Sequence, residues 1–306
     1  MSIKSKALKP RALRKTRGDI IFNTLVYALF ALCALFVLYP LWLVIIASVS
    51  DPIQVILGKV MLFPKGFSMV GYQKLLSAPI IWRSLANSIF YTGAGTALNL
   101  ILTMMCGYAL TRPFRGRKFV NVFLIFVMFF SGGLIPTFIT VKNLGLYNTP
   151  FIMIIMGAIN VFNVMIARTF IKGTIPEELH EAVVIDGGTD FSYFFRIVLP
   201  LSKACIGVLA VYYAVGHWND YYTGLIYIQS RNLYPFQNIL REMLTVLTSN
   251  SSSDFTANIT DAAQAARVAL AVKYCAVVIT TVPVLILYLF LQKYFVKGVM
   301  IGSLKG

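Results

Sequence analysis

The 306-residue chain has few charged side chains, and acidic ones are the scarcest, with 11 Asp and Glu against 27 Lys and Arg. Charged residues make up 12% of the sequence, roughly half of their usual share in soluble domains. Hydrophobic residues make up 58%. This composition excludes an ordinary soluble domain and is typical of a chain that lies in a lipid bilayer.

Residues that carry chemistry are also few. No glycine-rich loop ends in Gly-Lys-Ser or Gly-Lys-Thr, so the sequence offers no obvious place to hold ATP phosphates. The two histidines, His180 and His217, are too widely separated to suggest a metal site. All four cysteines lie in apolar runs, without the spacing of a metal site or a disulfide framework. We therefore expect no catalytic residue, no metal and no cofactor bound by this chain.

Charge-free runs predict the organisation of the chain. A helix needs roughly 20 apolar residues to span a bilayer. Five runs are long enough unaided, and a sixth, 204–219, becomes so if its helix continues past Asp220 toward Ile228. The five are 20–50, 84–111, 119–141, 143–167 and 274–292. The sequence therefore predicts an all-α integral membrane protein with six transmembrane helices.

Basic residues predict the orientation of these spans. They cluster before the first run, between the second and third, and after the last, at 4–17, 112–118 and 293–305. The positive-inside rule assigns these segments, and so both termini, to the cytoplasm. Topology and anionic lipid headgroups explain the net charge of +16 better than nucleic acid does. We expect a cytoplasmic basic tail (1–19), a six-helix transmembrane domain (20–295) and a cytoplasmic C-terminal tail (296–306).

One interior stretch, "PEELHEAVVIDGGTDFSYFFRIVLP" at 176–200, holds five of the 11 acidic residues. Pro176 suits the first turn of a helix, and Glu177 and Glu178 complement the positive end of its dipole. That helix can run to about Asp186. Because the stretch lies between the fourth and fifth runs, we expect it at the cytoplasmic surface.

A second short helix is predicted after a glycine elbow. Gly187 and Gly188 offer a left-handed stop, and Thr189 is a suitable N-cap. Four apolar residues then fall at helical i, i+3, i+4, i+7 spacing: Phe191, Phe194, Phe195 and Val198. An interfacial helix that rests on its phenylalanines explains this stripe but not the acidic residues, which anionic headgroups repel. The alternative is a rigid knob that inserts into a basic cleft of a soluble partner.

The stretch also carries a spaced motif. Its members are Glu181, Ala182, Gly187, Ile197, Leu199 and Pro200. This spacing resembles the signature loop of permease subunits of bacterial ATP-binding-cassette (ABC) importers, with Val183 in place of the family's second alanine. The resemblance covers most of the chain, including its closing "VKGVMIGSLKG". Within the family, the chain is similar to carbohydrate-uptake members related to the smaller maltose-type permease. Its stretch "SGGLIPTFITVKNLGLYNT" resembles that of members for oligosaccharides or polysaccharides.

The resemblance implies a non-enzymatic permease subunit of a bacterial plasma membrane, surrounded by lipid, that forms half of a sugar pathway. It implies three kinds of protein partner: a second permease of different sequence, two ATPase subunits that hold ATP and Mg²⁺, and an extracytoplasmic sugar-binding protein. Nucleic acid is not among them. In the family, the loop docks in a groove of the ATPase and transmits its closure.

The resemblance and the local pattern together assign functional residues. In the coupling loop (174–200) these are Glu181, Ala182, Gly187, Gly188, Phe191, Phe194, Phe195, Ile197, Leu199 and Pro200. The C-terminal tail, which in maltose-type subunits reaches the ATPase pair, contributes Lys297, Gly298, Gly302, Lys305 and Gly306.

Polar residues inside spans are costly and are functional candidates. The candidates for the substrate pathway lie in the fourth and fifth runs and just after: Asn160, Asn163, Tyr212, Tyr213, His217, Trp218, Asn219 and Asp220. Their aromatic rings suit stacking on sugar faces, and their polar groups suit hydrogen bonds to hydroxyls. For the neighbouring Tyr221 and Tyr222, an aromatic belt at the outer interface is an equally good interpretation.

Three alternatives stay open. The signature loop is shared with importers of other solutes, such as phosphate or amino acids. A secondary carrier driven by an ion gradient needs buried carboxylates in mid-span, and the predicted spans have none apart from Asp220. A membrane enzyme needs a constellation of carboxylates or histidines that faces a cleft, and none is visible in the sequence.

Overall fold

The structure is a computed structural model that describes residues 17–246 and 262–303. Within these ranges the chain forms helices, loops and one isolated β-bridge that pairs Ser50 with Phe67. The predicted all-α architecture is therefore confirmed for the described part. Most of the predicted basic tail, and Lys305 and Gly306 of the predicted C-terminal tail, lie outside it.

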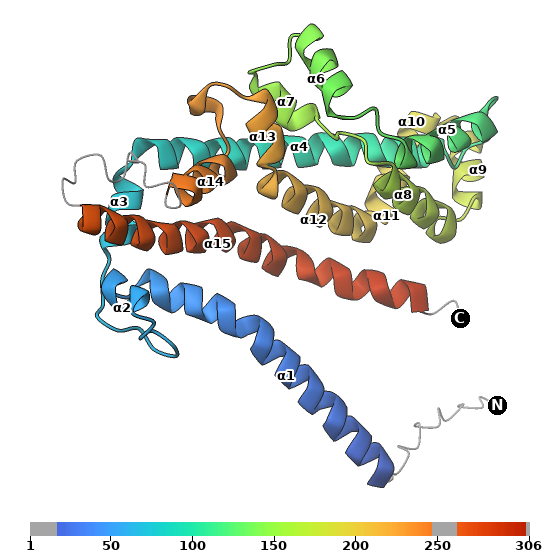
Figure 1. Ribbon diagram of the computed structural model, residues 1–306. Coiled ribbons are helices and arrows are strands. Elements are labelled where there is room, and N and C mark those ends of the chain that lie inside the picture. The colour runs from blue at the N-terminus through green and yellow to red at the C-terminus, as the bar shows by residue number, and fades with distance from the viewer. Residues whose placement is uncertain (1–16, 247–261, 304–306) are drawn as a thin grey trace.

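Helix α4 (Pro79–Ala109) is the central helix. It packs against α12 (Lys203–Asn219), α8 (Val161–Thr174), α7 (Pro150–Ile155) and α14 (Phe236–Val246) (Figure 1). Its buried face contains small and polar residues at regular spacing: Ser84, Ser88, Gly95, Asn99, Thr103 and Gly107. Small residues let the backbones of neighbouring helices approach closely in a membrane protein.

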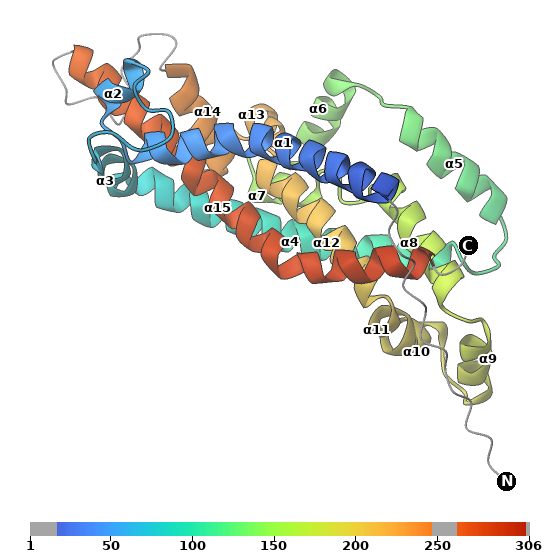
Figure 2. The ribbon, with the colours of Figure 1, turned by 90° about the horizontal axis from the view of Figure 1, so that it is seen from below.

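Two long helices lie on one side of this centre. Helix α15 (Ala262–Ser303) runs along α12 and also contacts the short α3 (Val70–Ser77). Helix α1 (Arg17–Ser48) contacts α15. The N-terminal half of α1 diverges from α15 (Figure 1). Figure 2 shows the same helices from below. Only the last three residues of α1 are buried. The rest of α1 is thus free to face lipid or another subunit.

The remaining short helices complete the described part. They are α2 (Pro52–Ile56), α5 (Arg117–Phe129), α6 (Leu134–Asn143), α9 (Glu178–Ile185), α10 (Asp190–Tyr193), the π-helical turn η1 (Phe194–Val198), α11 (Leu199–Leu201), α13 (Tyr222–Tyr227) and the 3₁₀ turn η2 (Arg231–Leu233). A satellite core joins α3, α14 and α15, where Leu75, Phe236, Ile239 and Cys275 are buried together.

Three of the predicted spans are broken rather than continuous. Run 119–141 becomes α5 and α6, and the chain bends by 113° between them, where Gly133 has a left-handed φ of +86°. Run 143–167 becomes α7 and α8, separated near Gly157 with φ of +72°. The expected continuation past Asp220 is wrong, because α12 ends at Asn219 and α13 starts afresh at Tyr222.

The number of spans therefore stays a prediction. Three described helices are long and apolar enough to cross a membrane, namely Arg17–Ser48, Pro79–Ala109 and Gln264–Leu289. Counting each of two bent pairs as one span, α5 with α6 and residues 190–201 with α12, gives up to five. The remaining predicted span is the α7–α8 segment. It is divided into two short helices, so neither is long enough to be recognised as a span by length and composition.

The contact between α4 and α12 gives a test of this packing. A Cβ added at Gly95 would lie 2.5 Å from the His217 ring, whereas one added at Gly93 meets nothing within 4 Å. Overpacking of this kind costs about 1–3 kcal/mol. We expect Gly95→Ala to lower the thermal unfolding temperature in detergent by several degrees and Gly93→Ala to leave it unchanged or slightly raised. Equal unfolding temperatures for the two variants would contradict the packing.

Candidate functional site

The glycine elbow of the 174–200 loop is confirmed. Helix α9 ends at Ile185 with Asp186 as its C-cap, and Gly187 follows with φ of +73°. Gly188 has an ordinary φ, but its Cβ would lie 2.5 Å from Val183 Cγ1, so it is needed for close approach rather than for the turn. The Thr189 hydroxyl accepts a hydrogen bond of 3.2 Å from the Ser192 amide, and Thr189 is therefore the N-cap of α10, as predicted.

The phenylalanine stripe divides between two surfaces. Phe194 and Val198 are buried, whereas Phe191 and Phe195 are exposed and their ring centroids lie 4.6 Å apart. The assignment of Phe194 to the contact with another subunit is wrong, because Phe194 packs with Val198 into the core of its own chain. Neither Phe194 nor Val198 is available for contact with another subunit.

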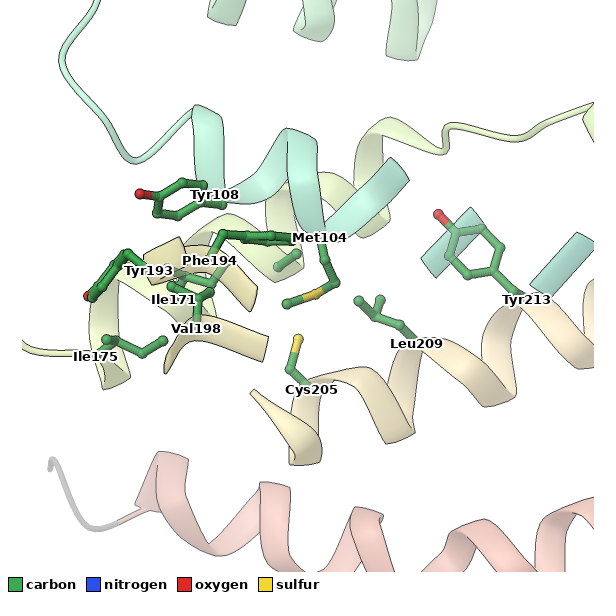
Figure 3. Close-up of a cluster of buried hydrophobic side chains, with 11 residues drawn as sticks. Met104, Tyr108, Ile171, Ile175, Tyr193, Phe194, Val198, Cys205, Leu209 and Tyr213 are labelled. Atoms are coloured by element: carbon green, nitrogen blue, oxygen red, sulfur yellow. The ribbon is translucent and has the colours of Figure 1, made fainter. Parts of the chain in front are cut away.

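These buried residues attach the loop to the membrane helices (Figure 3). The Phe194 ring lies 5.4 Å from that of Tyr108, near the end of α4. Ile171 of α8 and Leu209 of α12 belong to the same cluster. The loop is therefore one packed unit with three helices, and a displacement of the loop acts on all of them.

A polar network ties the loop to the same end of α4. The Tyr108 hydroxyl donates to Asp190 Oδ1 at 2.9 Å, and His180 Nε2 lies 2.8 Å from the same oxygen. Arg112 Nε donates to the Tyr108 hydroxyl at 3.2 Å, and its guanidinium also pairs with Glu177. Hydrogen bonds from His180 and Tyr108 hold the pKa of the Asp190 carboxyl below its usual value. We call these five residues the Tyr108–Asp190 network.

The outer surface of the loop is apolar as well as acidic. Glu181 is exposed and makes no side-chain hydrogen bond or ion pair within the described part of the chain. Ile185 is 84% exposed and Phe191 66%. Two large exposed apolar side chains within one short loop are consistent with a contact surface. Ile185 was missed at the sequence level, although its place just before the glycine elbow marks it as the tip of α9.

The proposed C-terminal tail continues the last helix. Helix α15 runs without a break through Lys297, Gly298 and Gly302 to Ser303. The predicted boundary at 296 therefore does not coincide with a change of secondary structure.

A second site is a cavity of about 340 Å³ between α4, α8 and α12. Six of the eight predicted pathway residues line it: Asn160, Asn163, Tyr212, Tyr213, His217 and Asp220. Two do not. Trp218 Nε1 donates a hydrogen bond to the Thr280 carbonyl of α15 at 3.1 Å. The Asn219 amide group donates to the Val215 carbonyl and accepts from the Gln237 side chain. These two residues pack the helices together instead of facing the cavity.

Two of the lining residues also cap broken helices. Asn160 Oδ1 accepts from the Asn163 amide at 3.2 Å and begins α8. Asp220 Oδ1 accepts from the Thr223 amide at 3.0 Å in α13. Helix breaks at membrane depth are tolerated where the freed backbone groups are satisfied or where they line a cavity. Both breaks occur at the cavity, as in transporters whose discontinuous helices form the substrate site.

Helix α4 completes the cavity wall. Asn99 Nδ2 lies 3.1 Å from His217 Nε2, and the Thr103 hydroxyl lies 2.6 Å from that of Tyr213. Asn99 was missed because the prediction was confined to polar residues of the fourth and fifth runs. The signal was present in the polar and small residues that recur along 84–111. The cavity lining contains no Lys or Arg among the described residues.

No cluster of three His, Cys, Asp or Glu residues that could hold a metal occurs in the parts of the chain at 17–246 and 262–303. The chemistry that this geometry offers is hydrogen bonding and aromatic stacking in the cavity, and a charged and apolar contact at the loop.

The Tyr108–Asp190 network predicts how firmly the loop is held. Tyr108→Phe removes the hydroxyl that joins Arg112 to Asp190, and a hydrogen bond to a charged group contributes about 1.5–3 kcal/mol. We expect the amides of α9 and α10 to exchange with solvent about tenfold faster in this variant. Tyr27→Phe, at an exposed position of α1, is the control. Unchanged exchange in Tyr108→Phe would show that the network does not hold the loop.

Comparison with known proteins covers nearly the whole chain, although no family model matches it. The Polygalacturonan/rhamnogalacturonan transport system permease protein YtcP of Bacillus subtilis is 37% identical over 94% of this chain and 99% of its own. Protein LplC of the same organism is 40% identical over 87% of this chain and 89% of its own. Among solved structures, a bacterial ABC transporter involved in the import of the acidic polysaccharide alginate has a chain that superposes with a TM-score of 0.84. The two chains are 28% identical, and the superposition covers 93% of this chain and 100% of that chain.

Proposed function

Because this chain belongs to the permease subunits of ABC carbohydrate importers, we propose that it forms half of the pathway for a uronate-containing oligosaccharide. It is a transport subunit of an oligosaccharide importer. The alternatives of a secondary carrier and a membrane enzyme are thereby dropped. The single observation that carries the proposal is the identity of 37% over nearly the full length of a permease named for polygalacturonan.

The substrate class follows from two similar proteins and one cavity. YtcP is named for polygalacturonan and rhamnogalacturonan, and the superposed structure imports an acidic polysaccharide. Polygalacturonan and alginate are polymers of uronic acids, and rhamnogalacturonan contains a uronic acid together with rhamnose. The cavity in this chain supports an oligosaccharide because Tyr212 and Tyr213 offer aromatic faces while Asn99 and Asn163 offer amides. Such a lining suits stacking and hydrogen bonding of sugar rings.

Coupling to ATP hydrolysis is proposed for the 174–200 loop. Glu181, Ile185 and Phe191 form its exposed contact surface, and a basic and apolar groove of an ATPase subunit would complement them. ATP and Mg²⁺ are held by that subunit. Because packed elements switch between discrete arrangements rather than deform continuously, a firmly attached loop passes movement of the ATPase to α4, α8 and α12.

The wider arrangement rests on exposure and charge. Helices α1 and α5 expose large apolar side chains along most of their length, which suits lipid and a second permease of different sequence. The basic clusters favour cytoplasmic termini in a bacterial plasma membrane. A sugar-binding protein on the outer side would deliver the substrate to the cavity.

Glu181 provides the test of coupling. If its carboxylate pairs with a basic group of the ATPase, Glu181→Ala removes a charge-assisted hydrogen bond worth about 1.5–3 kcal/mol. We expect substrate-stimulated ATP hydrolysis by the reconstituted importer to fall about tenfold while the subunit stays inserted. Glu242→Ala, which removes a carboxylate that pairs with Arg231 away from the loop, is the control. Full stimulation in Glu181→Ala would contradict the proposed contact.

The substrate class is tested by stimulation of ATP hydrolysis in the complete importer with its binding protein. Digalacturonate and trigalacturonate are expected to stimulate hydrolysis more strongly than raffinose or arabino-oligosaccharides. Stimulation by the neutral sugars alone would keep the family assignment and overturn the substrate class.

A further inference from the structure

The loop that follows α1 exposes a large amount of apolar surface. It comprises residues 52–69 and begins with α2, at the same end of the molecule as α3 and α14 (Figure 1). Apolar surface gathered in one short segment marks a site of contact with a protein or a membrane. Six large apolar side chains of this loop are 57–75% exposed: Ile56, Leu57, Met61, Leu62, Phe63 and Phe67.

Backbone hydrogen bonds close the base of the loop. Ser50 and Phe67 form the isolated antiparallel bridge, and the Asp51 amide donates to the Lys65 carbonyl at 3.1 Å. The two ends of the loop are thereby joined directly after the last residue of α1. The loop is held in one arrangement relative to that helix.

A side-chain hydrogen bond brings the tip of the loop back along α1. Trp42 Nε1 donates to the Leu62 carbonyl at 2.9 Å. Trp42 lies six positions before Ser48, where α1 ends, which is about 9 Å along the helix at 1.5 Å per residue. The tip, residues 61–63, therefore lies beside α1 and not beyond its end.

The sequence of α1 places Trp42 at the surface of the membrane. The charge-free part of the helix starts at Ile20, and roughly 20 apolar residues cross the hydrocarbon core of a bilayer. Counted from Ile20, the core ends near Tyr39. Trp42 then lies at the membrane–water interface, where Trp and Tyr are enriched. Because Leu62 is bonded to Trp42, the tip of the loop lies at the same depth.

Two lysines flank the apolar tip. Lys59 and Lys65 are exposed, and neither makes an ion pair with a residue in the described part of the chain. Lysines near the end of a span extend their ammonium groups to the interface while their apolar stems stay in the membrane. A phospholipid surface offers phosphates above and acyl chains below, which is the order of charge and apolar surface that the loop presents.

We propose that the 52–69 loop is a membrane anchor, whose apolar tip inserts into the outer leaflet while Lys59 and Lys65 bind phospholipid phosphates. Apolar side chains with basic neighbours bind interfaces in this way. The anchor fixes the end of α1 in the bilayer, and the Cys275 Sγ, 3.4 Å from the Ser48 carbonyl, joins that end to α15. The inference rests on the proposed orientation and is independent of the substrate.

Photo-crosslinking identifies what covers the tip. In the complete importer with its binding protein, Phe63 is replaced by p-benzoylphenylalanine, and the complex is placed in liposomes of phosphatidylethanolamine and phosphatidylglycerol. After irradiation the mass of each subunit is measured. We expect the main product to be this chain with one phospholipid attached. A main product with the second permease or the binding protein, or no lipid product at all, overturns the proposal.

Glu242 is the matched control site. It is exposed, as Phe63 is, and it lies in α14 at the same end of the molecule, but its carboxylate pairs with Arg231. With p-benzoylphenylalanine in place of Glu242, we expect no phospholipid product. Equal yields of lipid product at the two sites would overturn the insertion of the loop. Neither result bears on the substrate class or on coupling, which the assays of ATP hydrolysis test.

Charge reversal tests the two lysines. In Lys59→Glu combined with Lys65→Glu, attraction to anionic headgroups becomes repulsion, and we expect the yield of lipid product at residue 63 to fall about fivefold. Lys142→Glu, in α6 and outside the loop, is the control and leaves the yield unchanged. All three lysines are exposed, so the variants are expected to fold. An unchanged yield in the double variant would overturn the contact between the lysines and phosphate.

Discussion

The structure depends on one constraint, namely that a bilayer offers no partner for a broken backbone hydrogen bond. Every interruption of a spanning helix must be satisfied within the protein. The chain interrupts two segments at the same place, and Asn160 and Asp220 cap the new helix ends there. The cavity lies between these ends. The polar groups that the chain needs to tolerate its breaks are therefore the same groups that line a route for a polar substrate.

Helix α4 connects the cavity with the loop. Asn99 lies in the cavity wall and Tyr108 lies in the loop cluster, nine positions further along one uninterrupted helix, or about 14 Å at 1.5 Å per residue. Because the same helix carries both contacts, the cavity and the loop cannot move independently without breaking the packing of α4. The buried polar residues of α4 are thus part of the fold and part of the site at once.

Local features of the sequence could be predicted well, and tertiary ones could not. The turn at Gly187 and the cap at Thr189 depend on neighbouring residues alone, and both were correct. By contrast, Phe191 and Phe194 are equally apolar and differ only in which helix lies beside them. Trp218 was assigned to the pathway with His217, although adjacent residues on a helix point about 100° apart. The helix breaks escaped prediction because hydropathy does not register capping.

The burial of Phe194 changes how the loop can act. If all three phenylalanines contacted the partner, most of the loop's apolar surface would lie on that partner, and the loop could move with it without moving the membrane helices. Instead Phe194 and Val198 hold the loop in its own core, and only Phe191 and Phe195 remain outside. The loop continues through α11 into α12 with a bend of 80°. A force on the exposed surface of the loop is therefore transmitted to α12, which carries His217. The hydrogen bond between His217 and Asn99 transmits it further to α4.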